Sequence, residues 1–527
     1  MLSTTFFCAS VPLSILVYFL AIIMYRYFFH PLAKVPGPRL AAITHLWLAV
    51  THRDGQTHRV AQALHAKYGP VVRVSPEEVI VCSEEGLRTI YSASSHYDKA
   101  PWHQVAKPPV VANGAGDLDF FTESNRDKYK MQRRLIGPIY STASLEKHED
   151  RLDSTVSRLV ASLKRLDNKT VDVGEWLHMF ILDALSDLTI SKNQGFLEAG
   201  NDSGNKDQAS NMWRYFVIIG ALPSVFNLQK YIPKEYVTKA VCRVFGLENP
   251  QGMSMFRWAY MQMQKRLAAS KSLAGAAPAS QKIPNFPIAK AAGMMGEKEQ
   301  SSEFSDPNND ILGDLMALST QRPDFLQPWV MRMALTTFGA AHDTINVALA
   351  ASVFCIARSP ATLSRVRAEL ATLGPNPRYS EAAKLPYLQA CIKESIRLFP
   401  AIANSMSRVI PAGGVKLSGF YLPAGTIVGM VPTAYHTDTS IFGSDAGEFN
   451  PDRWFGQTQG LDKKLLIFGG ASRSCPGQYL AMFIMVKALV AIFSGFEVQL
   501  KNEEDVKHVS YFSAHLEDCK ASFVSRG

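Results

Sequence analysis

The sequence predicts a mainly α-helical protein with a minor β-sheet region, built as one large domain behind an N-terminal transmembrane helix. From about Tyr129 onward, apolar residues recur at steps of three and four positions, which is the spacing of one helix face. Earlier β-branched runs at 71–74 and 79–81 are typical of a small hairpin. The 527 residues contain no internal repeat, which favours a single domain. The clearest helical segments are 145–166, 176–190, 213–226, 329–357 and 362–373.

Residues 1–29 predict a membrane anchor. The run 6–24 carries no charge and is close to the roughly 20 apolar residues that cross a bilayer. A cleaved signal peptide is the alternative, but the segment lacks a basic start, and its apolar core exceeds the usual length of about 7 to 15 residues. The positive-inside rule places the body in the cytosol, since basic residues follow the span. These residues are Arg26, Lys34 and Arg39.

Residues 30–40 predict a Pro-rich hinge between this anchor and the body. Pro36 and Pro38 flank Gly37, and prolines stop a helix because they fix φ and lack an N–H donor. The main domain is then expected at 41–527. Within it, the stretch 270–309 is rich in Ala, Gly, Ser, Pro and Lys, which predicts a mobile surface connection.

Charge and cysteine content narrow the functional classes. The net charge of +9 suits an acidic partner or an anionic membrane surface. No nucleic-acid partner is expected, because no basic stripe interleaved with aromatic residues and no zinc-finger spacing is present. The seven cysteines are scattered without CxxC pairs, so neither a zinc site nor a disulfide framework is indicated. Most should be small buried apolar residues in a reducing compartment.

Cys475 differs from the other cysteines in its neighbours. It lies in the segment 468–477 (FGGASRSCPG), directly before an apolar helical run at 479–493. Small residues let the backbone approach a flat cofactor, and the N-terminus of the following helix favours a thiolate. Arg473 can pair with a carboxylate of such a cofactor. The alternative is a buried structural cysteine beside a helix start.

This segment resembles the haem-binding loop of the cytochrome P-450 family, which has the form FxxGxRxCxG. Phe468, Arg473, Cys475 and Gly477 match the pattern, and Ala471 replaces the family's central glycine. The resemblance implies a cytochrome P-450 fold and a haem, iron protoporphyrin IX, as cofactor. It also implies that the Cys475 thiolate is the axial ligand of the haem iron, with the other matching residues binding the cofactor.

A second match is a helical segment with Glu394 and Arg397 at i and i+3, where the two can pair. In the resembled family this pair joins an arginine of a later PxRW segment, which is Arg453 here. A buried charge triad is costly unless it is fully hydrogen-bonded. The implied role is therefore structural: the triad should lock the loop that presents the cysteine.

A third match places an acid and a hydroxyl group side by side, Asp343 and Thr344, within a long apolar helix. A helical threonine can bond the carbonyl four residues earlier, here that of Ala340. The segment resembles the family's oxygen-activation motif, although Ala341 replaces a glycine and Ile345 replaces a second hydroxyl residue. The resemblance implies that the pair is catalytic. A solvent-facing polar pair is the alternative.

Two further segments resemble the family's contacts to the haem propionates. Tyr129 and Arg133 match its C-helix, which implies that Arg133 faces one propionate and that Tyr129 contributes a hydroxyl group. Arg408 matches the arginine that meets the other propionate. Solvated surface arginines are the alternative. The resemblance extends over nearly the whole chain from Pro36, with its motifs in the family's order.

The implied function is a haem-thiolate monooxygenase of the endoplasmic reticulum membrane, single-pass, with its catalytic domain in the cytosol. It would use O₂ and electrons supplied by NADPH through NADPH–cytochrome P-450 reductase, while Asp343 and Thr344 relay protons. Its pocket is expected at 101–121, 212–226, 401–406, 509–516 and the start of the acid–threonine helix. These segments are mostly apolar and aromatic, so a hydrophobic small molecule is the expected substrate.

Phrases such as FHPLAKVPGPRLAA and YDKAPWH resemble fungal monooxygenases of the pisatin-demethylase and trichothecene-oxygenase kind. This likeness favours a role in secondary-metabolite biosynthesis. Two alternatives remain: a haem carrier or sensor without turnover, and a family member that rearranges oxygenated substrates without O₂. The retained Asp343 and Thr344 pair argues against the second alternative.

Overall fold

The computed structural model describes residues 2–107, 118–273, 309–322, 324–456 and 460–526. Of the connection predicted at 270–309, only the two ends fall within these ranges. Helices dominate the described chain and the sheets are small, which confirms the predicted mainly α-helical fold with a minor β-sheet region.

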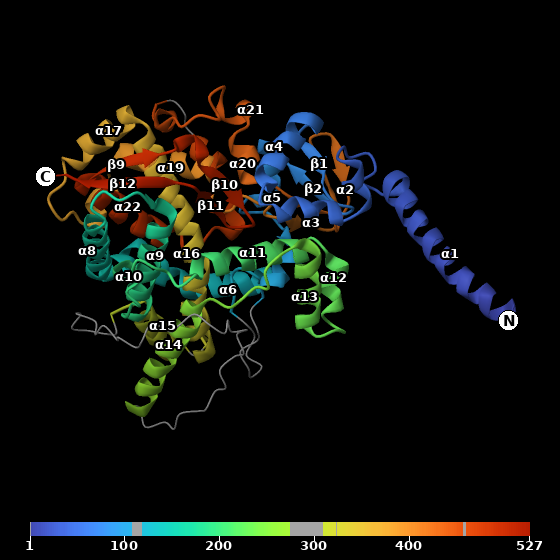
Figure 1. The fold of residues 1–527 in the computed structure, drawn as a ribbon, viewed down its shortest axis with the longest axis horizontal. Coiled ribbons are helices and arrows are strands. Elements are labelled where there is room, and N and C mark those ends of the chain that lie inside the picture. The colour runs from blue at the N-terminus through green and yellow to red at the C-terminus, as the bar shows by residue number, and fades with distance from the viewer. Residues whose placement is uncertain (1, 108–117, 274–308, 323, 457–459, 527) are drawn as a thin grey trace.

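The helices form a body from which α1 (Leu2–Met24) projects (Figure 1). The helices that surround the core are α6 (Arg126–Ile136), α8 (Glu149–Arg165), α9 (Val173–Ile190), α11 (Asn205–Gly220), α14 (Ser254–Leu273), α15 (Ile311–Gln321), α16 (Gln327–Arg358), α17 (Pro360–Leu370), α19 (Pro386–Leu398) and α22 (Gln478–Gly495). The remaining helices are α2 (Arg39–Ile43), α3 (Leu46–Arg53), α4 (Thr57–Tyr68), α5 (Glu84–Tyr91), α7 (Thr142–Leu145), α10 (Phe196–Ala199), α12 (Pro223–Leu228), α13 (Lys234–Phe245), α18 (Tyr379–Ala382), α20 (Pro432–His436) and α21 (Thr439–Phe442).

The strands form one five-stranded sheet and three smaller ones. The larger sheet has the order β1-β2-β8-β5-β3, and its strands are β1 (Val71–Arg73), β2 (Glu78–Val81), β8 (Ile427–Gly429), β5 (Arg408–Val409) and β3 (Asp98–Lys99). The predicted hairpin is confirmed as β1 paired antiparallel with β2. The smaller sheets join β4 (Val171–Asp172) to β12 (Lys520–Ser525) and β9 (Phe496–Lys501), β10 (Lys507–Ser510) to β11 (Ala514–Glu517), and β6 (Val415–Leu417) to β7 (Phe420–Leu422).

The long helix α16 runs through the middle of the body (Figure 1) and packs against α9, α15, α19 and α22. Both α16 and α22 are apolar and long enough to cross a bilayer, but most of each is buried inside the body. Their apolar character is that of core helices, since a helix that is hydrophobic on all sides is either buried or in a membrane. The core therefore holds both the acid–threonine pair and the helix that follows the cysteine.

Two predicted boundaries differ from the structure. The helix expected at 213–226 is divided, because α11 ends at Gly220 and α12 begins at Pro223. Proline has no N–H group, and its ring collides with the carbonyl four residues earlier, so the first helix cannot continue through it. The helix expected at 145–166 begins at Glu149, after a short 3₁₀ turn.

Residues before the body are packed rather than free. Leu32 and Val35 of the predicted hinge are buried against the larger sheet. Arg26 donates to the carbonyl of Ile43 at 2.8 Å and lies 3.5 Å from Glu77, which ties the end of the projecting segment to the body. A side chain at Gly37 would collide with the backbone of Arg73.

Candidate functional site

Cys475 lies in a tight loop between a short 3₁₀ turn and α22. Its N–H group donates to the carbonyl of Phe468 at 2.7 Å, which closes the loop. Gly469 has φ of +76°, a left-handed conformation that glycine adopts without strain. A side chain at Gly470 would collide with Tyr91, so this position has a packing requirement as well. The loop geometry depends on its small residues, as the sequence indicates.

The surroundings of the Cys475 sulfur differ from those of the other described cysteines. Cys475 is partly accessible, whereas the remaining cysteines with a described environment are buried. Burial raises the pKa of the Cys475 thiol, while a hydrogen bond from the backbone of Gly477 and the charge of Arg133 act in the opposite direction. The Gly477 backbone and Arg133 favour the thiolate form of Cys475. A metal ion bound to the sulfur would favour it further, so that the thiol loses its proton.

Four basic side chains gather around the ring of Tyr129, which is itself buried. Arg473 lies 4.8 Å and Lys99 lies 5.8 Å from the ring centroid. Arg133 and Arg408 also act on the pKa of Tyr129, which burial raises. The structure thus brings together the predicted residues Tyr129, Arg133, Arg408 and Arg473 beside the cysteine loop, and adds Lys99 to them.

These cations bond to carbonyl groups instead of carboxylates. Lys99 donates to the carbonyls of Phe120 and Phe121, Arg473 to those of Glu123 and Ser124, and Arg408 to those of Met406 and Ser407. Among the ion pairs of the described residues, these cations have one carboxylate contact, Asp98 at 3.8 Å from Arg473. Nη1 of Arg133 is buried without a hydrogen-bond partner. Buried charge without counter-charge is costly, so the cluster fits a ligand that carries carboxylates.

Lys99 was not predicted as a site residue. It pairs directly with Arg408 across β3 and β5, which sets two like charges opposite each other. Burial, together with Arg408 and Arg473, lowers the pKa of Lys99 well below its usual value. Sequence reasoning missed this lysine because the two strands are short and far apart in the chain, and no local pattern marks Lys99 as a site residue.

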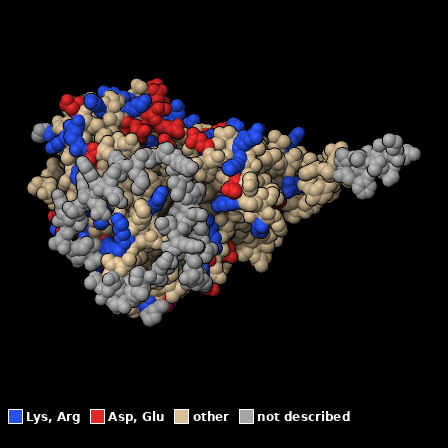
Figure 2. Space-filling view, turned by 60° about the horizontal axis from the view of Figure 1, so that its bottom comes forward, with Lys and Arg blue, Asp and Glu red and all other residues tan. Residues whose placement is uncertain are grey.

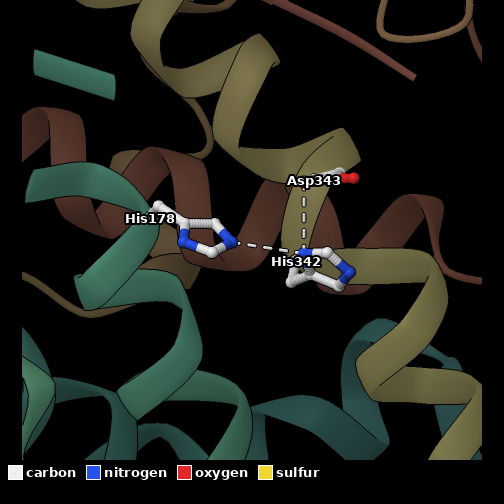
Figure 3. Close-up of side chains that lie close together, drawn as sticks. All are labelled: His178, His342 and Asp343. Atoms are coloured by element: carbon white, nitrogen blue, oxygen red, sulfur yellow. Dashed lines mark hydrogen bonds and ion pairs between the residues drawn. The ribbon is translucent and has the colours of Figure 1, made fainter. Parts of the chain in front are cut away.

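The acid and hydroxyl pair lies on α16, which continues without a break through both residues. The hydroxyl group of Thr344 donates to the carbonyl of Ala340 at 2.7 Å, as the sequence predicts. Asp343 Oδ1 lies 3.2 Å from Nδ1 of His342 (Figure 3). Burial alone would raise the pKa of Asp343, but His342, with smaller contributions from His178 and His515, lowers it to about 2. Asp343 is therefore a carboxylate at neutral pH.

The residues Glu394, Arg397 and Arg453 form a buried ion network. Arg397 binds the Glu394 carboxylate through two nitrogen atoms at 2.8 Å, and Arg453 Nε donates to the same carboxylate at 2.8 Å. Trp454 adds a further donor at 3.0 Å. Glu394 and Arg397 are completely buried. The network satisfies its charges internally, which is the condition for burying such a triad.

His436 connects this network to the cysteine loop and was not predicted. Its Nδ1 lies 3.1 Å from the carbonyl of Arg397, and its Nε2 accepts a hydrogen bond from the N–H group of Leu466 at 3.0 Å. Burial and the charge of Arg397 lower its pKa to about 3, so the ring is neutral and can donate from one nitrogen while it accepts at the other. Leu466 precedes Phe468 of the cysteine loop by two positions.

Three of the predicted pocket segments meet in one aromatic cluster. Trp102, Phe121, Trp213 and Phe512 contact one another with ring centroids 4.7 to 6.0 Å apart. Aromatic rings at these distances pack favourably in edge-to-face geometry. The cluster gives this side of the molecule an apolar interior.

Comparison with known proteins agrees with the combination of a helical body, a cysteine loop and an acid–threonine helix. The cytochrome P-450 family model matches residues 35–245 and 278–516. The chain belongs to the cytochrome P-450 family and is a monooxygenase of that family.

Several fungal relatives match most of the chain. Cytochrome P-450 monooxygenase sdnT of Sordaria araneosa is 32% identical over 100% of this chain and 96% of its own length. Cytochrome P-450 monooxygenase cicH of Emericella nidulans is 28% identical over 93% of this chain and 94% of its own length. Pisatin demethylase of Fusarium vanettenii is 26% identical over 93% of this chain and 88% of its own length.

Replacing Arg453 by Met tests the ion network. The variant removes one of the two cations that bind the buried Glu394 carboxylate and breaks the network, so we expect the free energy of unfolding to fall by about 3–5 kcal/mol. Arg365→Met is the matched control, because Arg365 forms a half-exposed pair with Asp452 next to Arg453. Such a pair contributes about 1 kcal/mol or less. Urea unfolding followed by circular dichroism measures both changes, and equal losses would contradict a special role for the network.

Proposed function

We propose that this chain is a haem-thiolate monooxygenase that oxidises a hydrophobic small molecule with O₂ and electrons from NADPH, delivered by NADPH–cytochrome P-450 reductase. The observation that carries the proposal is the partly accessible Cys475 beside a cluster of cations. Among the described residues this cluster has one carboxylate contact, Asp98 at 3.8 Å from Arg473, and Nη1 of Arg133 is buried without a hydrogen-bond partner. A haem offers an iron for the sulfur and two propionate groups for the cations. The residues present therefore fit the cofactor.

Each residue near the cysteine then has a specific task. Cys475 would be the axial ligand, with Phe468 and Gly477 shaping its loop. Arg133, Arg408, Arg473 and Lys99 would hold the propionates, assisted by Tyr129. When bound, the haem supplies a thiolate-ligated iron, whose electron-rich sulfur favours cleavage of the O–O bond. The charge-assisted bonds to arginine would orient the cofactor.

Asp343 and Thr344 would handle the protons that the reaction consumes. The balance is RH + O₂ + NADPH + H⁺ → ROH + H₂O + NADP⁺, where RH is the substrate. Thr344 donates its own proton to Ala340, so its oxygen is free to accept a hydrogen bond on the pocket side. Asp343 can receive a proton and pass it on as a general acid.

The substrate would bind against the aromatic cluster of Trp102, Phe121, Trp213 and Phe512. Such a surface excludes water and selects hydrophobic molecules. The fungal relatives, one of them named pisatin demethylase, support a role in fungal secondary-metabolite biosynthesis.

We further propose that residues 1–29 anchor the protein in the endoplasmic reticulum membrane by a single pass, with the body in the cytosol. Apolar side chains from Leu13 to Leu20 are exposed, and a membrane would cover them. Figure 2 shows the described part of this projecting segment almost without charged side chains. The tie between Arg26 and Glu77 would hold the body close to the membrane surface.

The decisive test of the cofactor assignment is the carbon-monoxide difference spectrum of the reduced protein in microsomes. The wild type should show the red-shifted Soret band of thiolate ligation, and Cys475→Ala should lose it completely. Cys242→Ala is the control, since this cysteine is buried in α13, and it should retain the band. A band typical of histidine ligation in the wild type would reject the proposal.

Substitution of Lys99 by Met tests the propionate site. The change removes a buried like charge, so the apoprotein should unfold at the same or a higher urea concentration than the wild type. Haem affinity should nevertheless fall about ten-fold or more, because hydrogen bonds to charged groups contribute about 1.5–3 kcal/mol. Lys67→Met on α4 is the surface control. An unchanged haem affinity in titrations of the apoprotein would contradict the assignment.

Removal of residues 2–24 tests the anchor. The full-length protein should remain in the carbonate-washed membrane pellet, whereas the truncated chain should be released in part or entirely. Electrophoresis of the full-length protein distinguishes the signal-peptide alternative, which requires a mature chain shorter by the cleaved segment. Recovery of uncleaved full-length protein in the soluble fraction would reject the anchor.

A further inference from the structure

A chain of polar side chains connects Asp343 to a loop on the far side of α9. Asp202 Oδ2 lies 3.0 Å from Nδ1 of His178, and Nε2 of the same ring lies 3.2 Å from Nδ1 of His342. That nitrogen lies 3.2 Å from Oδ1 of Asp343. Figure 3 shows His178 on α9 pointing toward His342 and Asp343 on α16.

The two histidines in the middle of this hydrogen-bonded series are more deeply buried than the two carboxylates at its ends. The side chains of His178 and His342 are 0% and 1% exposed, whereas those of Asp202 and Asp343 are 19% and 15% exposed. The two histidines therefore form a buried link between two partly exposed carboxylates. A histidine pair in this position is not required for packing alone, because apolar residues fill the rest of the contact between α9 and α16.

The hydrogen-bond partners determine which nitrogen atoms of the two histidine rings carry a hydrogen. Asp202 accepts bonds from the backbone of Gly204 and Lys206, so it is an acceptor, and Nδ1 of His178 must carry a hydrogen toward it. The other nitrogen of His178 can then accept from His342 when neutral, or donate to it when protonated. Nδ1 of His342 lies 3.2 Å from both Nε2 of His178 and Oδ1 of Asp343, so it can take up a proton from the first and give one up to the second.

Asp343 needs a supply of protons. With a pKa of about 2, it is almost always ionised at neutral pH and cannot store the proton that it delivers. Histidine is the side chain that exchanges protons near neutral pH. Burial lowers the pKa of His178 below its usual value, although the hydrogen bond to Asp202 acts in the opposite direction.

We propose that Asp202, His178 and His342 form a proton-conducting chain that reloads Asp343 during turnover. This inference rests on the monooxygenase function proposed above. A proton passes from Nε2 of protonated His178 to Nδ1 of His342 and then to Oδ1 of Asp343, which leaves His178 neutral with its hydrogen still at Nδ1. When the ring turns away from His342, Nε2 takes up the next proton from water, and the relay returns to its starting state. Each transfer breaks one N–H or O–H bond and forms another, with no net change in the chain once it is reloaded.

The cluster also resembles a metal site, because the ligand atoms of His178, His342 and Asp343 lie within 4.8 Å of one another. The hydrogen-bond distances between neighbouring atoms account for this closeness without an ion. Other titratable groups act on the chain and would shift its pH dependence. His515 on β11 acts on Asp343, and Asp202 interacts with Glu175 at the start of α9. His515 is in turn affected by Glu517 and Lys206, and Glu175 by Lys206, Asp172 and Asp207.

The test compares relay variants in the full-length holoenzyme with reductase and NADPH, without added substrate, from pH 5.5 to 8.5. The measured quantity is NADPH consumed per O₂, which is one when peroxide forms and two when O₂ is reduced to water. The wild-type ratio should exceed one at low pH and fall as His178 loses its proton. His178→Gln and His342→Gln should hold the ratio near one throughout.

Asp202→Asn gives a sharper readout. It keeps an acceptor for His178 but removes the negative charge, so the pH midpoint of the ratio should move to lower pH. The matched controls are His148→Gln and Asp314→Asn, since these residues form a comparable pair of a buried histidine and a partly exposed carboxylate, 3.1 Å apart, away from Asp343. The controls should follow the wild type. A wild-type ratio of one at every pH would overturn the proposal. So would relay variants whose ratio equals that of the wild type.

A second measurement does not depend on turnover. In ¹⁵N-histidine NMR of the full-length protein, the titration midpoint of His178 should move to lower pH in Asp202→Asn and should change in His342→Gln, but not in Asp314→Asn. An unchanged midpoint in both relay variants would contradict the connected chain. Failure of the monooxygenase function would appear separately, as a wild type without the red-shifted carbon-monoxide band.

Discussion

The position of the cysteine loop depends on one buried carboxylate, that of Glu394. It accepts hydrogen bonds from Arg397, Arg453 and Trp454, and Arg397 in turn holds the carbonyls of His436 and Ala446. Through the neutral ring of His436 the same network reaches Leu466, at the start of the segment that turns into the cysteine loop. Because most of these links are buried, water cannot readily replace a lost partner, and removal of one member weakens the compensation of the buried charge.

The molecule therefore contains two kinds of buried charge. Around Glu394 opposite charges meet and the network is complete within the protein. Around Tyr129 cations predominate, and carbonyl groups with a single carboxylate contact, Asp98, only partly compensate them. The first arrangement stabilises the fold by itself, whereas the second raises its free energy until an anionic ligand binds. This difference separates residues that support the site from residues that bind, and neither burial nor residue type alone would make that distinction.

The sequence predicts those features that depend on neighbouring residues. The helical spacing, the β1–β2 hairpin, the pairing of Glu394 with Arg397 and the bond from Thr344 to Ala340 are all local, and each occurs in the structure. Lys99, His436 and His178 were missed because their partners lie far away in the chain, and in isolation each is an ordinary lysine or histidine. The break at Pro223 was missed for another reason: apolar periodicity continues through it, although proline cannot continue the helix.

The helix α16 combines demands that usually conflict. Its apolar residues form the centre of the core and must exclude water, yet Asp343 requires a source of protons. A water-filled path beside the helix would weaken the packing that positions Thr344. Two buried histidines resolve the conflict, because they are compact, fill space between α9 and α16, and exchange protons without admitting bulk solvent. The departures from the family motif at Ala341 and Ile345 keep this part of the helix apolar, so proton supply from the side, through α9, is consistent with the packing around it.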